Sequence, residues 1–292
     1  MVWVKSKEFL IKAPYRLVAF YPVILGTTRE DPFKNRMMFG FGRTMVNLMM
    51  KGFINKYRAK FGLQPISDVW SHWMGEKVIV ACDRELNPVR EGVAFSYTQT
   101  GFMILPSLNR LPVSVQAFLD SGEPPVYIGF GSNPITDSGK FSPVFEQVRD
   151  ATRRRLIVSK GWADLPESHS PDILFVDEMP FEVLFPRLSA VIYHGGTGTM
   201  AAVVRAGIPQ AAFPFMGDQF SNRDQIVKLG LGPKTCDFSK MTAASISSAI
   251  IECVTNDKYK RNAAGISQKL QNVNGTDLTI QLIEKEFMHA RI

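Results

Sequence analysis

The segment of the sequence best suited to chemistry is a glycine-rich turn that carries one histidine. Residues 191–193 are apolar β-formers, and they lead directly into His194. Three glycines follow at once: Gly195, Gly196 and Gly198. Glycines allow a tight turn and leave backbone N–H groups uncovered, and a helix expected over 199–206 would add unpaired amide donors and the positive end of its dipole. The pattern predicts an anion site suited to a diphosphate, with His194 as a further donor.

A second polar pair follows the next apolar segment. Asp218 and Gln219 come shortly after residues 210–215. A carboxylate next to an amide can both accept hydrogen bonds from a vicinal diol and donate to it, as a sugar ligand requires. Asp218 could also be the N-cap of a helix that begins at Gln219, and the sequence leaves both interpretations open.

Together these motifs resemble a known signature. Residues 191–222 read His-Gly-Gly-x-Gly-Thr, then Arg-Ala-Gly-Ile-Pro, then Pro-Phe-x-Gly-Asp-Gln-Phe. This order resembles the donor-binding signature of inverting, family 1 (GT-B) UDP-glycosyltransferases, especially the sterol and lipid 3-beta-glucosyltransferases and their bacterial natural-product relatives. The resemblance implies that Asp218 and Gln219 bind the sugar of a UDP-hexose, most simply UDP-glucose. It implies these diphosphate-binding residues: Gly131, Ser132, His194, Gly195, Gly196, Gly198 and Thr199.

Segments nearer the N-terminus extend the resemblance to the nucleoside. Residues 175–184 are similar to the segment whose backbone pairs with the uracil edge, which implies that Val176 supplies that backbone. Trp162 is a candidate wall for the nucleotide, although an aromatic residue after a strand is as often part of a core. Ala202 stands where plant relatives carry a glutamate that holds the ribose hydroxyls, and the lipid and bacterial branches also lack that glutamate.

The order of apolar segments predicts an α/β fold. Stretches long enough for crossover helices separate them, which favours a parallel sheet. We expect strands over 126–130, 156–159, 173–176, 190–194 and 210–215, and further helices over 243–255 and 276–289. Each site motif follows one of these strands, where ligands of parallel sheets bind.

The resemblance also implies a domain organisation. Enzymes of this kind have two facing Rossmann-like domains, and at roughly 30 residues per βαβ unit these need more than about 300 residues. The sequence has 292 residues. We therefore expect a Rossmann-like donor domain with a parallel sheet and an incomplete second Rossmann-like acceptor domain. The expected boundaries are 1–104 for the acceptor-side domain, 105–123 for a linker, 124–275 for the nucleotide-sugar donor domain and 276–292 for a C-terminal helix that crosses back.

The expected reaction needs two kinds of group. An inverting transfer requires a base for the acceptor hydroxyl and donors that stabilise the departing diphosphate. The donors are present, but none of His72, His169 and His289 stands in a matching context, so no catalytic residue is assigned. The sequence contains no Asp-x-Asp cation motif, and we expect no metal and no cofactor.

The missing base leaves several functions open. One is hexosyl transfer to a sterol or another lipophilic hydroxyl, with the base supplied by an unrecognised residue or by a second polypeptide that completes the acceptor domain. A second is a UDP-sugar-binding subunit without activity of its own. A third is a nucleotide-sugar epimerase on the same architecture, although the extra acidic residues that it needs are not found.

The first part of the chain is basic. Through residue 123 it has 16 Lys and Arg against 10 Asp and Glu, which is +6 of the total net charge of +7. Residues 43–61 form a basic amphipathic pattern with these apolar positions: Met45, Met49, Phe53, Tyr57 and Phe61. Such a helix can lie on an anionic membrane, although packing inside the protein is the commoner use. The sequence carries no nucleic-acid-binding signature, so we favour a lipid surface or a partner.

Targeting and redox signals are few. No apolar run approaches the roughly 20 residues that span a bilayer, and the N-terminus lacks the pattern of a signal peptide. Cys82, Cys236 and Cys253 are odd in number and form no CxxC pair, which argues against a disulfide framework or a zinc site. We expect a cytoplasmic protein, with peripheral membrane contact through its basic part as a further expectation.

Overall fold

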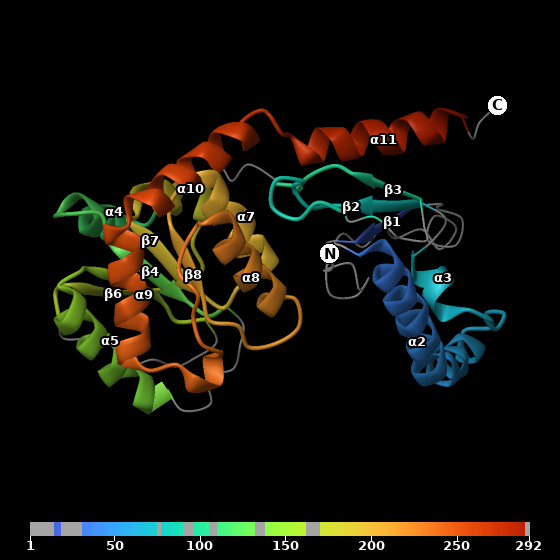
Figure 1. Cartoon of the computed structure of the whole chain (residues 1–292), viewed down its shortest axis with the longest axis horizontal. Helices are drawn as coiled ribbons and strands as arrows, with labels where there is room; N and C mark the ends of the chain where they lie inside the picture. Colours follow the sequence, from blue (N-terminus) through green and yellow to red (C-terminus); the bar gives the residue numbers. More distant parts are fainter. Residues whose placement is uncertain are drawn as a thin grey trace. The chain divides into compact units, whose positions relative to one another are not determined.

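The protein consists of two compact units. The computed structural model describes residues 15–18, 31–74, 77–89, 91, 96–104, 110–131, 138–161 and 170–289 (Figure 1). The first unit comprises Met1–Ile104 and Asn274–Ile292, and the second unit comprises Leu105–Val273. Each unit is built around its own parallel sheet.

The second unit contains a five-stranded parallel sheet, as predicted. Its strands are β4 (Val126–Gly129), β5 (Leu156–Ser159), β6 (Ile173–Val176), β7 (Ala190–Tyr193) and β8 (Gln210–Ala212). Their order in the sheet is β6-β5-β4-β7-β8. β8 ends earlier than expected, two residues before Pro214, which has no N–H to donate to a sheet.

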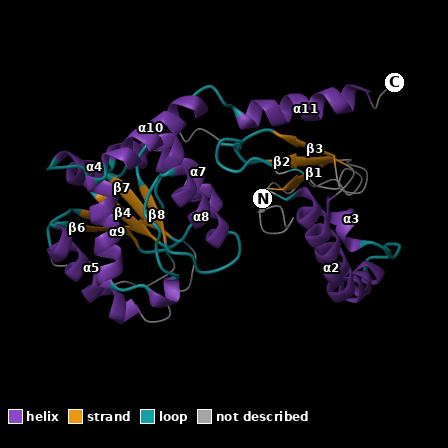
Figure 2. Ribbon diagram, in the orientation of Figure 1, coloured by secondary structure: helices purple, strands orange, loops and turns teal. Residues whose placement is uncertain are grey.

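Helices cover both faces of this sheet (Figure 2). The helices are α4 (Val113–Asp120), α5 (Ser138–Thr152), α6 (Phe181–Leu184), α7 (Thr197–Ala206), α8 (Gln219–Leu229), α9 (Ala243–Thr255) and α10 (Asp257–Leu270), with 3-10 turns η1 (Phe185–Arg187) and η2 (Phe238–Lys240). Ile128 and Ile192 point to the face that α5 and α9 cover, whereas Tyr127 and Val191 point to the other face, and all four are buried. Burial on both faces explains why the strands read as continuous apolar runs.

The segment 105–123, predicted as a linker, contains helix α4. Arg155, just before β5, holds the end of this helix: its guanidinium donates to the carbonyl of Phe118 and, at 2.8 Å, to the Ser121 hydroxyl. The same guanidinium lies 4.0 Å from the centroid of the Phe118 ring. A cation–π contact and two hydrogen bonds therefore fasten α4 within the second unit.

The first unit has a smaller parallel sheet. Its strands are β1 (Tyr15–Val18), β2 (Lys77–Val80) and β3 (Ser96–Gln99), in the order β1-β2-β3, and its helices are α2 (Pro32–Lys60), α3 (Val69–Met74) and α11 (Gly275–His289). The amphipathic helix predicted from Arg43 thus begins at Pro32. Asp31 caps it by accepting the N–H groups of Phe33 and Lys34, and Pro32 suits the first helical position.

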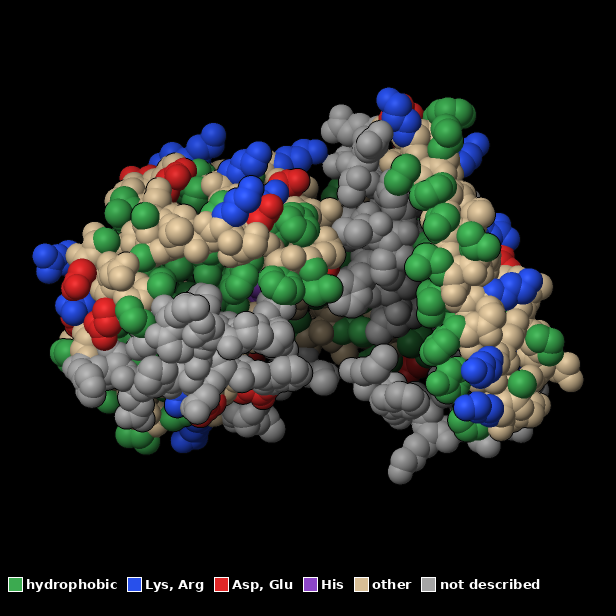
Figure 3. Space-filling model, turned by 90° about the horizontal axis from the view of Figure 1, so that it is seen from below, with side chains coloured by type: hydrophobic (Ala, Val, Ile, Leu, Met, Phe, Trp, Pro, Cys, Tyr) green, Lys and Arg blue, Asp and Glu red, His purple; other side chains and the backbone are tan. Residues whose placement is uncertain are grey.

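The apolar stripe of α2 lies on the surface, contrary to the expectation that it packs inside the protein. Met45 is half-buried, whereas the other four predicted members are exposed, by 70% for Met49, 57% for Phe53, 46% for Tyr57 and 76% for Phe61. Figure 3 shows hydrophobic side chains beside Lys and Arg along the surface of α2. Periodicity shows that a helix has an apolar face but not what covers it. No helix among the described residues is long and apolar enough to cross a membrane.

Candidate functional site

The candidate site lies at the carboxyl ends of the central strands β4 and β7. From β4 the chain continues through α5 to β5 on one side, whereas from β7 it continues through α7 to β8 on the other. Parallel sheets bind ligands at such a switch point, because the connecting loops separate there. Gly131 follows β4 at this edge, and His194 follows β7.

The ring of His194 is wedged between two of the predicted glycines. A Cβ atom at Gly196 would lie 2.3 Å from Nε2 of His194, and one at Gly131 would lie 2.9 Å from its Cε1. Gly131 and Gly195 have φ angles of +63° and +88°, which favour glycine. The glycines therefore give the imidazole its place as well as allowing the chain to turn.

Helix α7 presents an open N-terminus at the same edge. It begins at Thr197, two residues before the predicted start, so it includes Thr197 and Gly198 although both are weak helix formers. Its N-cap is Gly196, which offers no side-chain cap, and the first intrahelical bond runs from the Met200 N–H to the Gly196 carbonyl at 2.9 Å. The N–H groups before Met200 are available to an anion.

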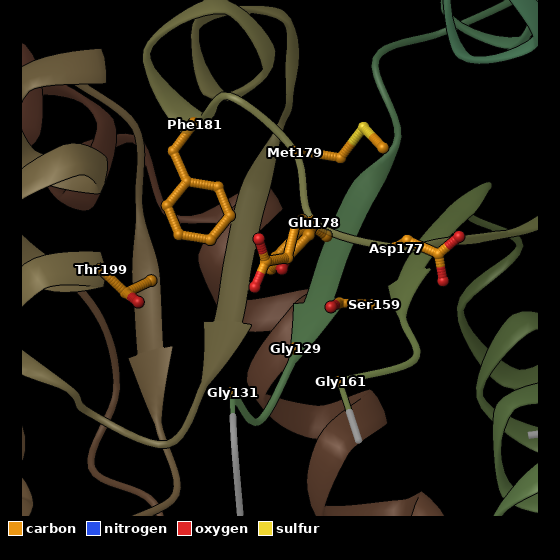
Figure 4. Close-up of a pocket in the computed structure, with 10 residues that line it drawn as sticks. Gly129, Gly131, Ser159, Gly161, Asp177, Glu178, Met179, Phe181 and Thr199 are labelled. Atoms are coloured by element: carbon orange, nitrogen blue, oxygen red, sulfur yellow. The ribbon is translucent and has the colours of Figure 1, made fainter. Parts of the chain in front are cut away.

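A cavity of about 380 Å³ opens beside this terminus (Figure 4). Its lining residues are Tyr127, Gly129, Gly131, Ser159, Gly161, Asp177, Glu178, Met179, Phe181 and Thr199. In Figure 4 the side chains of Thr199, Phe181 and Glu178 lie around the same space, with Ser159 beyond them. The cavity thus brings two predicted diphosphate-binding residues, Gly131 and Thr199, together with groups from the ends of β5 and β6. Its volume suits a small-molecule ligand.

Aromatic rings form part of this cavity, and the sequence reasoning missed them. The ring centroids of Tyr127 and Phe181 are 5.9 Å apart, and Phe181 stacks on Phe185 at 4.4 Å. Burial raises the pKa of Tyr127, and a hydrogen bond with Ser159 opposes this shift. Phe181 could have been noticed because it begins α6, five residues after β6, within the segment 175–184 that the resemblance already linked to the nucleoside.

Three predicted residues remain to be placed. Ser132 and Trp162 lie outside the described residues. Val176 is buried at the end of β6 and directly precedes Asp177, which lines the cavity. Its carbonyl accepts the Lys160 N–H at 2.9 Å. Its pairing with a nucleobase stays a prediction.

Asp218 and Gln219 lie at the start of α8, and their side chains are already engaged. Asp218 occupies the N-cap position but makes no capping hydrogen bond; instead its Oδ2 accepts the Thr197 hydroxyl at 2.6 Å. Gln219 is 8% exposed, and its Oε1 accepts the N–H groups of Phe215 at 2.7 Å and Met216 at 3.0 Å. The structure thus ties Asp218 to the first residue of α7, a contact that the sequence did not reveal.

The electrostatics of the site favour a neutral histidine. Burial lowers the pKa of His194, and the nearby charge of Asp218 partly opposes this shift. A neutral imidazole keeps one N–H donor near pH 7. Nδ1 of His194 is buried and has no hydrogen-bond partner among the described residues, so a neutral His194 donates to an anion when Nε2 carries the ring hydrogen.

Two of the other three histidines belong to the first unit. His72 is exposed on α3, His169 lies outside the described residues, and His289 ends α11. In the described part of the chain, no group of three or more His, Cys, Asp or Glu side chains could hold a metal ion.

Comparison with known proteins agrees with this architecture. Residues 158–283 match the family model of the erythromycin biosynthesis protein CIII-like C-terminal domain. The vancomycin aglycone glucosyltransferase of Amycolatopsis orientalis is 37% identical over 73% of this chain and 52% of its own length. The sterol 3-beta-glucosyltransferase UGT80B1 of Arabidopsis thaliana is 28% identical over 84% of this chain and 38% of its own length. The crystal structure of CalG4, the calicheamicin glycosyltransferase, superposes with a TM-score of 0.65 at 17% identity, over 96% of this chain and 72% of its own.

The fold and the site define a class. A parallel α/β sheet with an open helix terminus at its switch point is an arrangement typical of nucleotide-binding domains, and the superposition shows the GT-B fold. By sequence the chain is related to the family 1, GT-B glycosyltransferases. It spans about half the length of the curated relatives that it matches.

Proposed function

We propose that the chain is an inverting, metal-independent glycosyltransferase. It binds UDP-glucose as the donor and moves the glucose to a hydroxyl of a sterol or another lipophilic acceptor. Two of the relatives are named glucosyltransferases, one for a sterol and one for the vancomycin aglycone, which supports glucose as the sugar. The acceptors in these names differ, and a lipophilic hydroxyl follows the sterol branch.

The observation that carries the proposal is the open N-terminus of α7 beside His194. As the bond to the sugar breaks, negative charge grows on the departing diphosphate. The free amides of Thr197, Gly198 and Thr199, the helix dipole and the neutral His194 are fixed donors for that charge. Gly131 borders the same cavity and leaves room for the phosphate oxygens to approach the backbone.

The three parts of the donor occupy different parts of the proposed site. The diphosphate lies against the turn after β7, the nucleoside extends into the cavity along β5 and β6, and the sugar reaches Asp218 and Gln219. Asp218 accepts from a sugar hydroxyl, whereas the amide nitrogen of Gln219 can donate to one. No described residue is assigned as the base that takes the acceptor's proton.

A binding measurement tests the diphosphate site. His194→Ala should weaken UDP binding by about 1.5 to 3 kcal/mol, the loss expected for a hydrogen bond to a charged group, which is roughly 10- to 150-fold in Kd. Titration calorimetry with the full chain measures it. The matched control is His72→Ala, because His72 is exposed in the other unit. An unchanged Kd for His194→Ala would rule out the role given to this residue.

A turnover measurement tests the activity. The full chain is incubated with UDP-glucose and a panel of sterol and phenolic acceptors, and UDP release is followed. Acceptor-dependent release supports the transferase. UDP binding without release would instead favour the UDP-sugar-binding subunit, which needs a partner to supply the base.

A further inference from the structure

Three polar side chains join the two helices that begin at the candidate site. Thr197 is the first residue of α7, Asp218 stands at the N-cap of α8, and Asn222 lies one turn into α8. The Thr197 hydroxyl donates to Oδ2 of Asp218 at 2.6 Å, and Nδ2 of Asn222 donates to the Thr197 oxygen at 3.0 Å. Thr197 therefore receives one hydrogen bond and passes one on to the carboxylate.

Asn222 links this chain of hydrogen bonds to the glycine turn. It is 1% exposed, and Nδ2 also donates to the Gly195 carbonyl at 2.8 Å. These two short bonds use both hydrogens of the amide, and Oδ2 of Asp218 lies further from Nδ2, at 3.4 Å. Gly195 directly follows His194, so a single buried amide connects the turn that holds the imidazole with the helix that carries Asp218.

The arrangement fixes one oxygen of Asp218 and leaves the other to a ligand. Oδ2 is held by Thr197, whereas among the described residues no hydrogen bond to Oδ1 is found. The next residue, Gln219, anchors the preceding loop through Phe215 and Met216. Asp218 thus has little freedom to turn, and its unengaged oxygen can accept only from a donor such as a sugar hydroxyl.

We propose that Thr197 and Asn222 are positioning residues, which orient Asp218 toward the transferred sugar and tie it to the diphosphate-binding turn. This inference rests on the proposed function. It distinguishes the two residues by what they hold: Thr197 holds only the sugar-binding carboxylate, whereas Asn222 holds both the carboxylate arm and the turn. Loss of the Thr197 hydroxyl should therefore affect the sugar part of the donor and spare UDP.

Calorimetry with the full chain separates these effects by comparing UDP-glucose with UDP. Thr197→Val keeps the shape of the side chain but removes the donor to Asp218 and the acceptor of one Asn222 hydrogen bond, while Asn222 keeps its hydrogen bond to the Gly195 carbonyl. We expect its affinity for UDP-glucose to fall about fivefold, the loss of one ordinary hydrogen bond, while its affinity for UDP stays within about twofold. Thr197→Ser retains a hydroxyl and should restore the ratio of the two affinities. Thr255→Val is the matched control, because Thr255 is exposed at the end of α9 and its hydroxyl donates to the Ile251 carbonyl of the same helix.

Asn222→Ala provides an independent variant, with circular dichroism as the check that it folds. It should weaken both UDP and UDP-glucose, because the Gly195 turn loses its support. The inference is overturned if Thr197→Val leaves the ratio of the UDP-glucose and UDP affinities unchanged, whether or not both affinities fall. It is also overturned if Thr197→Ser behaves like Thr197→Val. Absence of UDP and UDP-glucose binding in the unsubstituted chain would instead overturn the proposed function.

Discussion

The interiors of the two units are stabilised by different kinds of contact. In the second unit, strands such as β4 and β7 are buried along their whole length between helices on both faces. In the first unit, the 29-residue helix α2 buries only Asn35 and Phe39, and its contact with α3 combines the buried Phe39–Trp70 pair with polar groups. Asp68 accepts hydrogen bonds there from Arg43, Asn47 and Ser71.

This difference shows where the site obtains its rigidity. His194, Thr197 and Asp218 follow strands or begin helices of the unit with the closed core, so small displacements of the site cost packing energy. The first unit has no such constraint along most of α2. We expect binding of the nucleotide to depend on the second unit, and three measurements can break or sharpen this contrast.

The largest effect should come from the core of the second unit. Ile128 is 0% exposed in β4, and Ile128→Ala should destabilise the protein by about 2 to 5 kcal/mol through lost burial and a cavity. Leu48→Ala is the matched change on α2, where Leu48 is 77% exposed, and it should stay within about 0.5 kcal/mol. Urea unfolding followed by circular dichroism measures both. Equal losses would mean that α2 is packed as firmly as the sheet.

A smaller effect is expected at the polar junction of the first unit. Burial would raise the pKa of Asp68, but hydrogen bonds from Asn47 and Ser71 outweigh it and hold the pKa well below 3.8. Asp68→Ala should cost about 1 to 3 kcal/mol. Because the folded-state pKa is lowered, this stabilisation is complete above pH 3.8 and is lost as the pH falls toward the folded-state pKa.

Trp70 is buried against Phe39, and in a background where the other three tryptophans are replaced by Phe its fluorescence reports this unfolding from within the first unit. Asp68→Asn is the intermediate variant, because it removes the charge and replaces one acceptor oxygen by an NH2 donor, so it keeps only the hydrogen bonds that a single oxygen accepts. A Trp70 transition that does not move in Asp68→Ala would show that α2 and α3 are held by other contacts.

The smallest effect concerns the ionisation of His194. Because burial lowers its pKa, nuclear magnetic resonance should find the imidazole of the free protein titrating below 6.5, and bound UDP should raise that value, since the diphosphate stabilises the imidazolium. The unfolded state then binds more protons than the folded state, so the protein loses stability as the pH falls through 6.5 toward the folded-state pKa. A pKa that does not respond to UDP would place the diphosphate away from this ring.

The sequence predicted the second unit well because its signals are local. Buried parallel strands appear as short apolar runs, and the His-Gly-Gly turn at residues 194–196 is contiguous. The contacts that complete the site are not local. Asn222 reaches Gly195 and Thr197 across more than twenty residues, and Tyr127 meets Phe181 only because β4 and β6 belong to one sheet. Such pairs have no periodic signature in a single sequence.

The first unit shows the opposite limit. The helical period around Met49 and Phe53 was visible, and so was the basic character of the segment. What a helix face contacts depends on the tertiary structure, so the expectation of internal packing for α2 was wrong. The early start of α2 at Pro32 could have been predicted, since an aspartate followed by a proline is a common helix beginning.

The contacts of Arg155 with helix α4 determine which segment of this protein can be transferred into another protein as a unit. A graft that begins at residue 124 would discard Phe118 and Ser121, and the guanidinium of Arg155 would lose these two hydrogen-bond acceptors. The transferable unit starts ahead of Val113, so an exchange of this unit between related proteins should place the junction before α4.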